Sequence, residues 1–428
     1  MAAAEAGWRS YSRVQLLYVP VLTLALAMML ARSFVAAGIL SVPEFALLSA
    51  GLLVSSTFVT FGCLGLQSLL QRELPGLVVR GRWRAGQMLL IQSVLVAAVL
   101  CVVGVVLVTL APSVTNLSPL LGMAAVLHGF SQQLFLLATV ESRSSLDPLR
   151  FAYENFARAL LALVLGAAAA FATGSALALL LVEAAVSLSV SARLMERYLN
   201  SRSLRADAIS RLAIRALTRL DWMAAASLFL VSIVGFLVLN LDRWLANGIL
   251  EPHAFAAYSF AWIALLAAQS VQVVINAAVY PYLANRYALY GRKRAFTIAA
   301  AISIAQIVGG LALALPALAI ANAGIAAYFP QYQAATAILP IFTIVAVIRI
   351  SDFFSSYLVI VNHERWVLVS DLCCSILGVS GWFLLRQPFG PEHATDLGTL
   401  AELAAVLAAL SFASKAMLSL ISLRRTVV

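Results

Sequence analysis

Five basic and four acidic residues interrupt long apolar stretches of this sequence. The basic residues are Arg32, Arg158, Arg243, Arg349 and Lys415, and the acidic ones are Glu183, Asp242, Asp371 and Glu402. Arginine binds phosphate oxygens through two parallel hydrogen bonds, and carboxylates in apolar surroundings commonly relay protons or pair with cations. The basic set is therefore a candidate substrate site for a phosphorylated anion, and the acidic set supplies candidates for coupling to Na⁺ or H⁺.

Each cation also has a purely structural interpretation. Arg32 and Arg243 lie shortly before Gly38 and Gly248, at the ends of their apolar stretches, where long side chains can extend to the membrane surface. Their near-equivalent positions favour a shared function. Lys415 lies close enough to the end of its stretch to reach water.

Two of the arginines have an acidic residue about one helical turn away. Glu154 precedes Arg158, and Asp352 follows Arg349. Such pairs can neutralise each other along one helix. The four acidic candidates could likewise be structural partners of basic residues.

The composition predicts an integral membrane protein. The chain has 428 residues, of which 63% are hydrophobic and 11% charged, and its mean hydropathy is +0.98. Soluble proteins average ~45–50% apolar and ~25% charged residues. A soluble fold of this composition would expose too much apolar surface.

Apolar runs long enough for a ~30 Å hydrocarbon core occur twelve times. They cover approximately 14–37, 42–70, 86–111, 117–141, 151–172, 174–197, 221–248, 252–284, 295–320, 333–358, 367–386 and 398–422. A membrane barrel would instead show segments of ~10 residues with alternating polarity. The predicted fold class is therefore all-α, with twelve transmembrane helices.

The basic residues outside these runs occupy alternate connections. Of the 28 basic residues, 22 fall at the two ends of the chain and in the even-numbered connections, and only Arg386 falls in an odd-numbered one. Because cytoplasmic loops retain Lys and Arg, we predict that both termini are cytoplasmic.

Two motifs recur at an offset of 210 residues. GILSVPEFALLSA at 38–50 matches GILEPHAFAAYSF at 248–260, and GRWRA at 81–85 matches GRKRA at 291–295. Each copy would hold six helices, an even number, so the copies are parallel repeats. We predict an N-terminal lobe at 1–205 and a C-terminal lobe at 206–428. A basic cytoplasmic linker at 198–220 would join them, either as an amphipathic surface helix or as a solvated segment.

Several segments resemble a known transporter family. They are LGLQSLLQRELP at 64–75, LDRWLANGIL at 241–250, AFAAYSFA at 254–261 and YFPQYQAATAILPIF at 328–342. In order and spacing they resemble the polysaccharide and O-antigen (Wzx-like) flippases of the multidrug/oligosaccharidyl-lipid/polysaccharide (MOP) exporter superfamily. The likeness covers essentially the whole chain. Two extra helices of the lipid-II branch, and the helix-one and helix-seven signatures of the drug exporters, are not apparent.

The resemblance implies a MATE-like fold and movement of a polyprenyl-diphosphate-linked oligosaccharide to the outer leaflet of the bacterial cytoplasmic membrane. It implies alternating access between the two lobes and a role in making cell-surface polysaccharide. The expected partners are this substrate, membrane lipids and a polysaccharide polymerase machinery, with no nucleic acid.

Two other functions remain open. One is a drug or small-molecule exporter of the same superfamily. The other is a membrane polysaccharide polymerase or ligase, although the outer connections are short and the longest, near 386–397, offers only Arg386, Glu392 and Asp396 as charged residues. No GxxxxGK[ST] or HExxH motif occurs, so we expect no enzyme activity, bound cofactor or metal.

Overall fold

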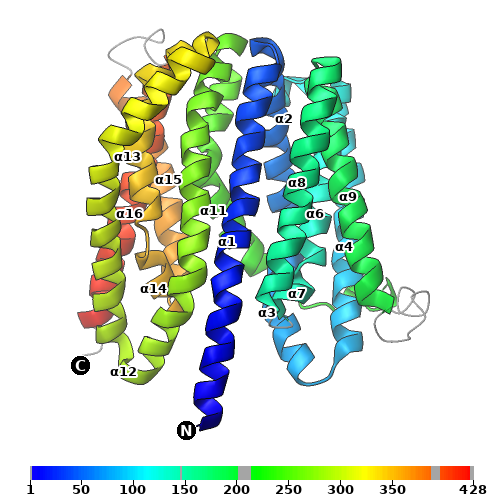
Figure 1. Cartoon of the computed structure of the whole chain (residues 1–428), viewed down its shortest axis with the longest axis vertical. Helices are drawn as coiled ribbons and strands as arrows, with labels where there is room; N and C mark the ends of the chain where they lie inside the picture. The colour runs from blue at the N-terminus through cyan, green and yellow to red at the C-terminus, as the bar shows by residue number, and fades with distance from the viewer. Residues whose placement is uncertain (1, 145–146, 201–213, 387–395, 425–428) are drawn as a thin grey trace. The chain divides into compact units, whose positions relative to one another are not determined.

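The computed structural model describes residues 2–144, 147–200, 214–386 and 396–424 (Figure 1). Helices make up nearly all of these residues, and no strand occurs among them. Within these ranges, twelve helices or helix segments are long and apolar enough to cross a membrane. They coincide with the twelve predicted apolar runs, so the all-α, twelve-span prediction is confirmed.

The described residues divide into two compact units, Met1–Ile233 and Val234–Val428. The predicted lobe boundary at 205/206 and most of the linker lie in 201–213, outside the described residues. The N-terminal unit contains α1 (Ala2–Ile39), α2 (Val42–Phe61), α3 (Leu66–Val79), α4 (Trp83–Leu110), α5 (Pro112–Thr115), α6 (Pro119–Ala138), α7 (Val140–Ser144), α8 (Pro148–Thr173), α9 (Ala176–Asn200) and the 3₁₀ turn η1 (Leu217–Arg219).

Helix α11 (Trp222–Ile249) begins in the first unit and continues into the second. The C-terminal unit then contains α12 (Pro252–Tyr328), the 3₁₀ segment η2 (Pro330–Ala337), α13 (Leu339–Ile350), α14 (Phe354–Ile360), α15 (Glu364–Arg386) and α16 (Leu397–Arg424). Helix α12 comprises two spans, Pro252–Asn276 and Asn285–Tyr328.

The repeated GIL motif forms the same turn in both units. In the first copy Ser41 is the N-cap of α2, its hydroxyl accepts a hydrogen bond from the Glu44 N–H at 3.4 Å, and Pro43 follows in the first turn. In the second copy Glu251 is the N-cap of α12, and Pro252 is its first residue. Proline suits this position because the first helical N–H groups have no partner within the helix.

The repeated GRxRA motif also has one backbone geometry in both copies. Gly81 has φ +68° between α3 and α4, and Gly291 has φ +73° at the bend within α12. This left-handed region is costly for residues with a Cβ. The shared glycine conformation supports a duplicated unit, as the sequence offset suggested.

Helix α2 ends earlier than predicted. The apolar run at 42–70 is interrupted after Phe61, and α3 starts at Leu66. Gly65 has φ +79°, and a Cβ there would lie 2.1 Å from the backbone oxygen of Ala225. The chain bends at Gly65 because only glycine allows α11 to approach so closely.

Apolar side chains on the outside of the helices fit a lipid environment. On α4, Val99, Val102, Val106 and Leu110 recur every three or four residues and are all exposed. In water such a stripe would be a large exposed apolar patch, whereas lipid tails solvate it. The structure is that of a multi-pass membrane protein.

The basic connections gather at one end of each unit. In the first unit, Figure 1 shows the α3–α4 turn and the C-terminal end of α9 at the same end. In the second unit, the bend of α12 at Gly291 and the C-terminal end of α16 share an end. This is the arrangement that the alternating basic connections predicted. That this end faces the cytoplasm remains a prediction.

Candidate functional site

The N-terminal unit contains a buried polar network centred on Glu183 of α9. The Glu183 carboxylate is fully buried, and its Oε2 lies 2.7 Å from an Arg32 nitrogen and 3.2 Å from His128 Nε2. Arg32 comes from α1 and His128 from α6. Three helices that are distant in sequence therefore meet at one carboxylate.

The network continues from His128 to two further helices. His128 Nδ1 lies 2.7 Å from the Ser55 hydroxyl of α2. Gln132, one turn after His128, donates to the Ser187 hydroxyl at 3.2 Å and accepts a hydrogen bond from Arg158 of α8. The Arg158 guanidinium also lies over the ring of Phe135, 4.3 Å from its centroid.

Arg158 is not neutralised along its own helix. Glu154, the alternative partner, accepts hydrogen bonds from Arg150 at 2.8 Å and from the Ser142 hydroxyl at 2.7 Å. The Arg158 Nε is buried and has no hydrogen-bond partner among the described residues. The network therefore holds two guanidinium groups, on Arg32 and Arg158, but one carboxylate, on Glu183, and it has an excess of positive charge whenever His128 is neutral.

A second group of charges links residues of α11 and α12 in the C-terminal unit. The Tyr258 hydroxyl donates to Asp242 Oδ2 at 2.8 Å. The Arg243 guanidinium lies 4.2 Å from the ring centroid of Trp262. Arg349 of α13 interacts electrostatically with Asp242 but forms no ion pair with it within 4.0 Å.

Arg349 differs from the other buried cations because its charge is not satisfied by hydrogen bonds. It is 8% exposed, and neither of its two terminal nitrogens has a hydrogen-bond partner among the described residues. The alternative partner, Asp352, instead lies 3.2 Å from Lys415. A buried guanidinium with free donors is costly unless an anion or water binds there.

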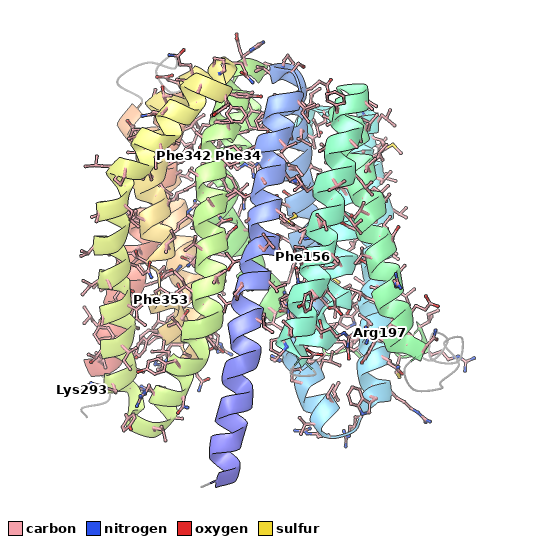
Figure 2. The ribbon with its side chains drawn as sticks, in the orientation of Figure 1. Phe34, Phe156, Arg197, Lys293, Phe342 and Phe353 are labelled. Atoms are coloured by element: carbon pink, nitrogen blue, oxygen red, sulfur yellow. The ribbon has the colours of Figure 1, made fainter. Side chains whose placement is uncertain are left out.

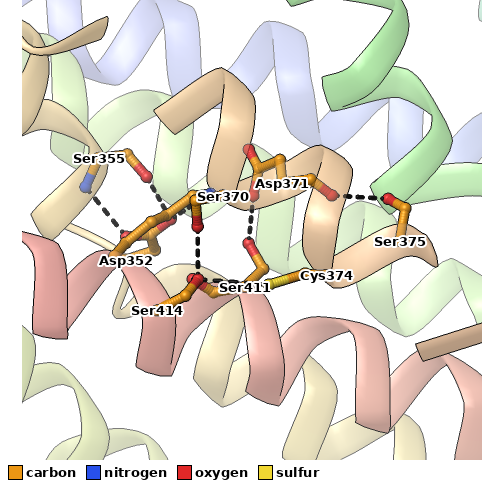
Figure 3. A network of polar contacts seen from close by, with 9 residues as sticks. Asp352, Ser355, Ser370, Asp371, Cys374, Ser375, Ser411 and Ser414 are labelled. Carbon is orange, nitrogen blue, oxygen red and sulfur yellow. Dashed lines mark hydrogen bonds and ion pairs between the residues drawn. The ribbon is translucent and has the colours of Figure 1, made fainter. Parts of the chain in front are cut away.

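A third group joins Lys415 of α16 to two carboxylates. Lys415 Nζ lies 3.0 Å from Asp371 Oδ1 of α15 and 3.2 Å from Asp352 Oδ2, between α13 and α14. Serines complete the arrangement, as Figure 3 shows: Ser411 donates to Asp371 at 2.7 Å, and Ser355 donates to Asp352. The Ser370 and Ser414 hydroxyls are 2.5 Å apart.

A cavity of about 200 Å³ connects the second and third groups. Its polar lining residues are Gln272, Arg349, Asp352, Asp371, Ser411 and Lys415, and apolar residues from α11, α13 and α16 complete its wall. This volume is well above the ~10–15 Å³ that one bound water requires. The cavity can accept a small polar group, with Arg349 as the free donor.

The predicted site residues thus fall into groups within each unit. Arg32, Arg158 and Glu183 meet in the N-terminal network, and Arg349, Lys415 and Asp371 meet at the C-terminal cavity. Asp242 and Arg243 lie near this cavity without lining it. Glu402 is exposed on α16 and does not line it either.

Sequence reasoning missed the neutral members of the network. His128, Gln132 and Ser55 were not among the predicted site residues. A signal was present, because His128 and Gln132 are spaced by one turn inside an apolar span. Such a pair indicates a polar face directed into a helical bundle.

Comparison with solved structures identifies the fold. The chain is similar to a multidrug resistance MATE family transporter of the MOP superfamily in its inward-facing conformation, with a TM-score of 0.59, 14% identity and 96% coverage of both chains. The outward-facing conformation of such a transporter gives 0.60, 13% and 96% of both chains. The eukaryotic MATE transporter AtDTX14 gives 0.56 and 12%, with 96% of this chain and 99% of that chain covered.

These likenesses show a MATE-like fold over nearly the whole chain. The predicted fold is confirmed, whereas identities of 12–14% leave the substrate undefined. No protein-family model matches the chain, and no curated protein matches its sequence.

Proposed function

We propose that this chain is an exporter of the bacterial cytoplasmic membrane that moves a polyprenyl-diphosphate-linked oligosaccharide from the inner to the outer leaflet by alternating access. The observation that carries the proposal is Arg349, a buried guanidinium with two unbonded nitrogens at the wall of a polar cavity. A diphosphate has the charge and the paired oxygens that a guanidinium binds best.

The N-terminal network supports the same substrate class. The network holds two arginines, Arg32 and Arg158, against one carboxylate, Glu183, so it also favours an anion over a cation. A charge at the bilayer centre costs ~2.5–3.5 kcal/mol on insertion scales, and such residues are therefore usually functional. A diphosphate crossing the membrane needs cationic groups of this kind along its path, while its polyprenyl tail can remain in lipid.

The acidic members are the candidates for ion coupling. Glu183, Asp242 and Asp371 each contact a proton donor or a cation, so protonation or Na⁺ binding would alter those contacts. Glu402 remains a candidate on sequence grounds. A polysaccharide polymerase machinery would receive the exported oligosaccharide.

A second candidate function is export of drugs or other small molecules. It is favoured by the printed descriptions of the structural neighbours, two of which are multidrug resistance transporters. Four buried or half-buried carboxylates, at Glu183, Asp242, Asp352 and Asp371, would suit a cationic compound. The fold accommodates either substrate equally well.

Reconstitution separates the two functions. Proteoliposomes containing the purified chain and a fluorescent polyprenyl-diphosphate oligosaccharide are treated with a quencher that reaches only outer-leaflet lipid. We expect the chain to accelerate exchange between leaflets, and Arg349→Met to remove the acceleration. A parallel arm measures uptake of a cationic dye such as ethidium. Dye transport without lipid exchange would identify a small-molecule exporter and overturn the proposal.

A further inference from the structure

A groove in the N-terminal unit, separate from the network around Glu183, runs between α8 and α9. Its volume is about 620 Å³, and it is lined near the start of α8 and the end of α9, the end that carries the basic connections. The two helices are joined by the turn at Gly174, with φ +62°, and run antiparallel. Both walls of the groove come from described residues of one unit.

The α8 wall is an apolar stripe. Leu149, Tyr153, Ala157 and Leu161 recur at every fourth position, which places them on one face of the helix. Tyr153 is 51% and Leu161 is 42% exposed. This wall has the length and character to lie against an acyl chain.

The α9 wall combines apolar residues with two unpaired cations. Val190 and Leu194 contribute the apolar part, and Arg193 and Arg197 lie one turn apart beside them. Both arginines are exposed, and neither has an ion-pair or hydrogen-bond partner among the described residues. Figure 2 shows Arg197 near the C-terminal end of α9.

The other charged residues of the groove already have contacts within the chain. Arg150 lies 2.7 Å from Glu141 and 2.8 Å from Glu154, while Asp147 Oδ1 accepts a hydrogen bond from the Arg150 backbone N–H at 3.0 Å. The residues that line the groove carry three positive charges, on Arg150, Arg193 and Arg197, and two negative ones, on Asp147 and Glu154, so the net charge of the lining is positive.

We propose that this groove binds an anionic phospholipid of the bilayer, with the phosphate between Arg193 and Arg197 and one acyl chain along the α8 stripe. The positive charge of the groove favours an anionic head group, and its apolar wall favours a ligand with an acyl chain. Basic pockets between transmembrane helices are typical sites for such head groups. This site stands apart from the proposed export function and holds for either transported substrate.

Native mass spectrometry of the full chain in detergent tests the site, with phosphatidylglycerol as the probe. The double variant Arg193→Gln/Arg197→Gln should weaken its binding about 25-fold, because each basic residue near an anionic lipid contributes roughly fivefold. Both residues are exposed, so the variant should fold. The matched control, Arg80→Gln/Arg84→Gln, removes two exposed arginines outside the groove and should bind as the unmodified chain does.

A third variant tests the apolar wall without changing any charge. Ala157 is exposed on that wall, and Ala157→Trp should fill the groove and reduce phosphatidylglycerol binding at least fivefold. Equally weakened phosphatidylglycerol binding in Arg80→Gln/Arg84→Gln would mean that the lipid is attracted by the overall positive charge of the chain, and it would contradict a site in this groove. Unchanged binding in Ala157→Trp would show that no acyl chain binds along the α8 wall. Equally tight binding of phosphatidylethanolamine, or competition by inorganic phosphate alone, would also contradict the proposal.

Discussion

Arg32 of α1 and Glu183 of α9 form a largely buried ion pair, 2.7 Å apart, within the N-terminal unit. Their helices are separated by most of that unit's sequence, so the pair links two elements that are distant along the chain. The same Glu183 oxygen also contacts His128. One carboxylate therefore serves both the packing of the unit and its charge balance.

The substitution Arg32→Ala should be strongly destabilising. It would leave Glu183 buried with an uncompensated charge, and removing one partner of a buried pair typically costs about 3–5 kcal/mol. The double variant Arg32→Met/Glu183→Gln should recover most of the lost thermal stability but not the export. Thermal unfolding in detergent and the reconstituted lipid-exchange assay measure the two effects. Full export by the stable double variant would assign the pair to packing alone.

The contact between Ser55 and His128 predicts a non-additive pair of substitutions. His128→Phe should destabilise the unit by about 1–3 kcal/mol, because the buried Ser55 hydroxyl and the Glu183 carboxylate each lose a partner. Adding Ser55→Ala should restore part of this loss, since no unsatisfied hydroxyl then remains. The unfolding temperatures of the two single variants and the double variant check this. Strictly additive losses would show that the contact carries little energy.

The sequence predicted the spans because their signal is local. Each span is a continuous apolar run, and its length follows from the thickness of the hydrocarbon core. The repeated GRxRA motif likewise indicated a duplicated unit, and its glycines at 81 and 291 both have positive φ, which glycine adopts most readily. The bend at Gly65 was not predicted, because it depends on the close approach of α11, which is distant in sequence.

The sequence indicated the charged residues of the candidate site, but it did not indicate their partners. A cation in an apolar span is visible in the sequence, whereas its partner is chosen by helix packing. Local spacing suggested Glu154 for Arg158 and Asp352 for Arg349. Tertiary packing instead brought Gln132 to Arg158 and Lys415 to Asp352.

Lys415 should hold the third charge group together. Lys415→Met keeps a similar length but leaves the Asp352 and Asp371 carboxylates without their shared cation. We expect a loss of about 3–5 kcal/mol, as for other broken buried pairs. Adding Asp352→Asn and Asp371→Asn should recover stability, because no unpaired charge remains. Ser414→Ala is the matched control, because it removes only neutral hydrogen bonds of the same cluster, to Ser370, Cys374 and the Ser411 carbonyl. It should cost less than Lys415→Met, about 1 kcal/mol for each bond lost. An equal loss in Ser414→Ala would argue against an electrostatic role for Lys415.

The alternating basic connections predict the orientation in the membrane. A reporter that is active only in the periplasm should be silent when fused after residue 428. The same reporter should be active when inserted into the connection between α4 and α6, at 112–118. Cytoplasmic retention of Lys and Arg is the physical reason for both outcomes. An active C-terminal fusion with a silent insertion would reverse the proposed orientation.

Arg349 gives the sharpest test of the substrate class. Since its terminal nitrogens have no hydrogen-bond partners among the described residues, Arg349→Met breaks no such bond and removes a costly buried charge. The unfolding temperature should therefore stay within a few degrees, in contrast to Arg32→Ala and Lys415→Met. Exchange of the diphosphate-linked lipid should nevertheless fall at least tenfold. Arg349→Lys should retain part of the activity, because lysine keeps the positive charge but cannot form the bidentate hydrogen bonds of a guanidinium. If Arg349→Met instead unfolds the chain at a much lower temperature, Arg349 is a structural partner of Asp242. If the stable variant still exchanges the lipid at the full rate, the diphosphate does not bind at this cavity.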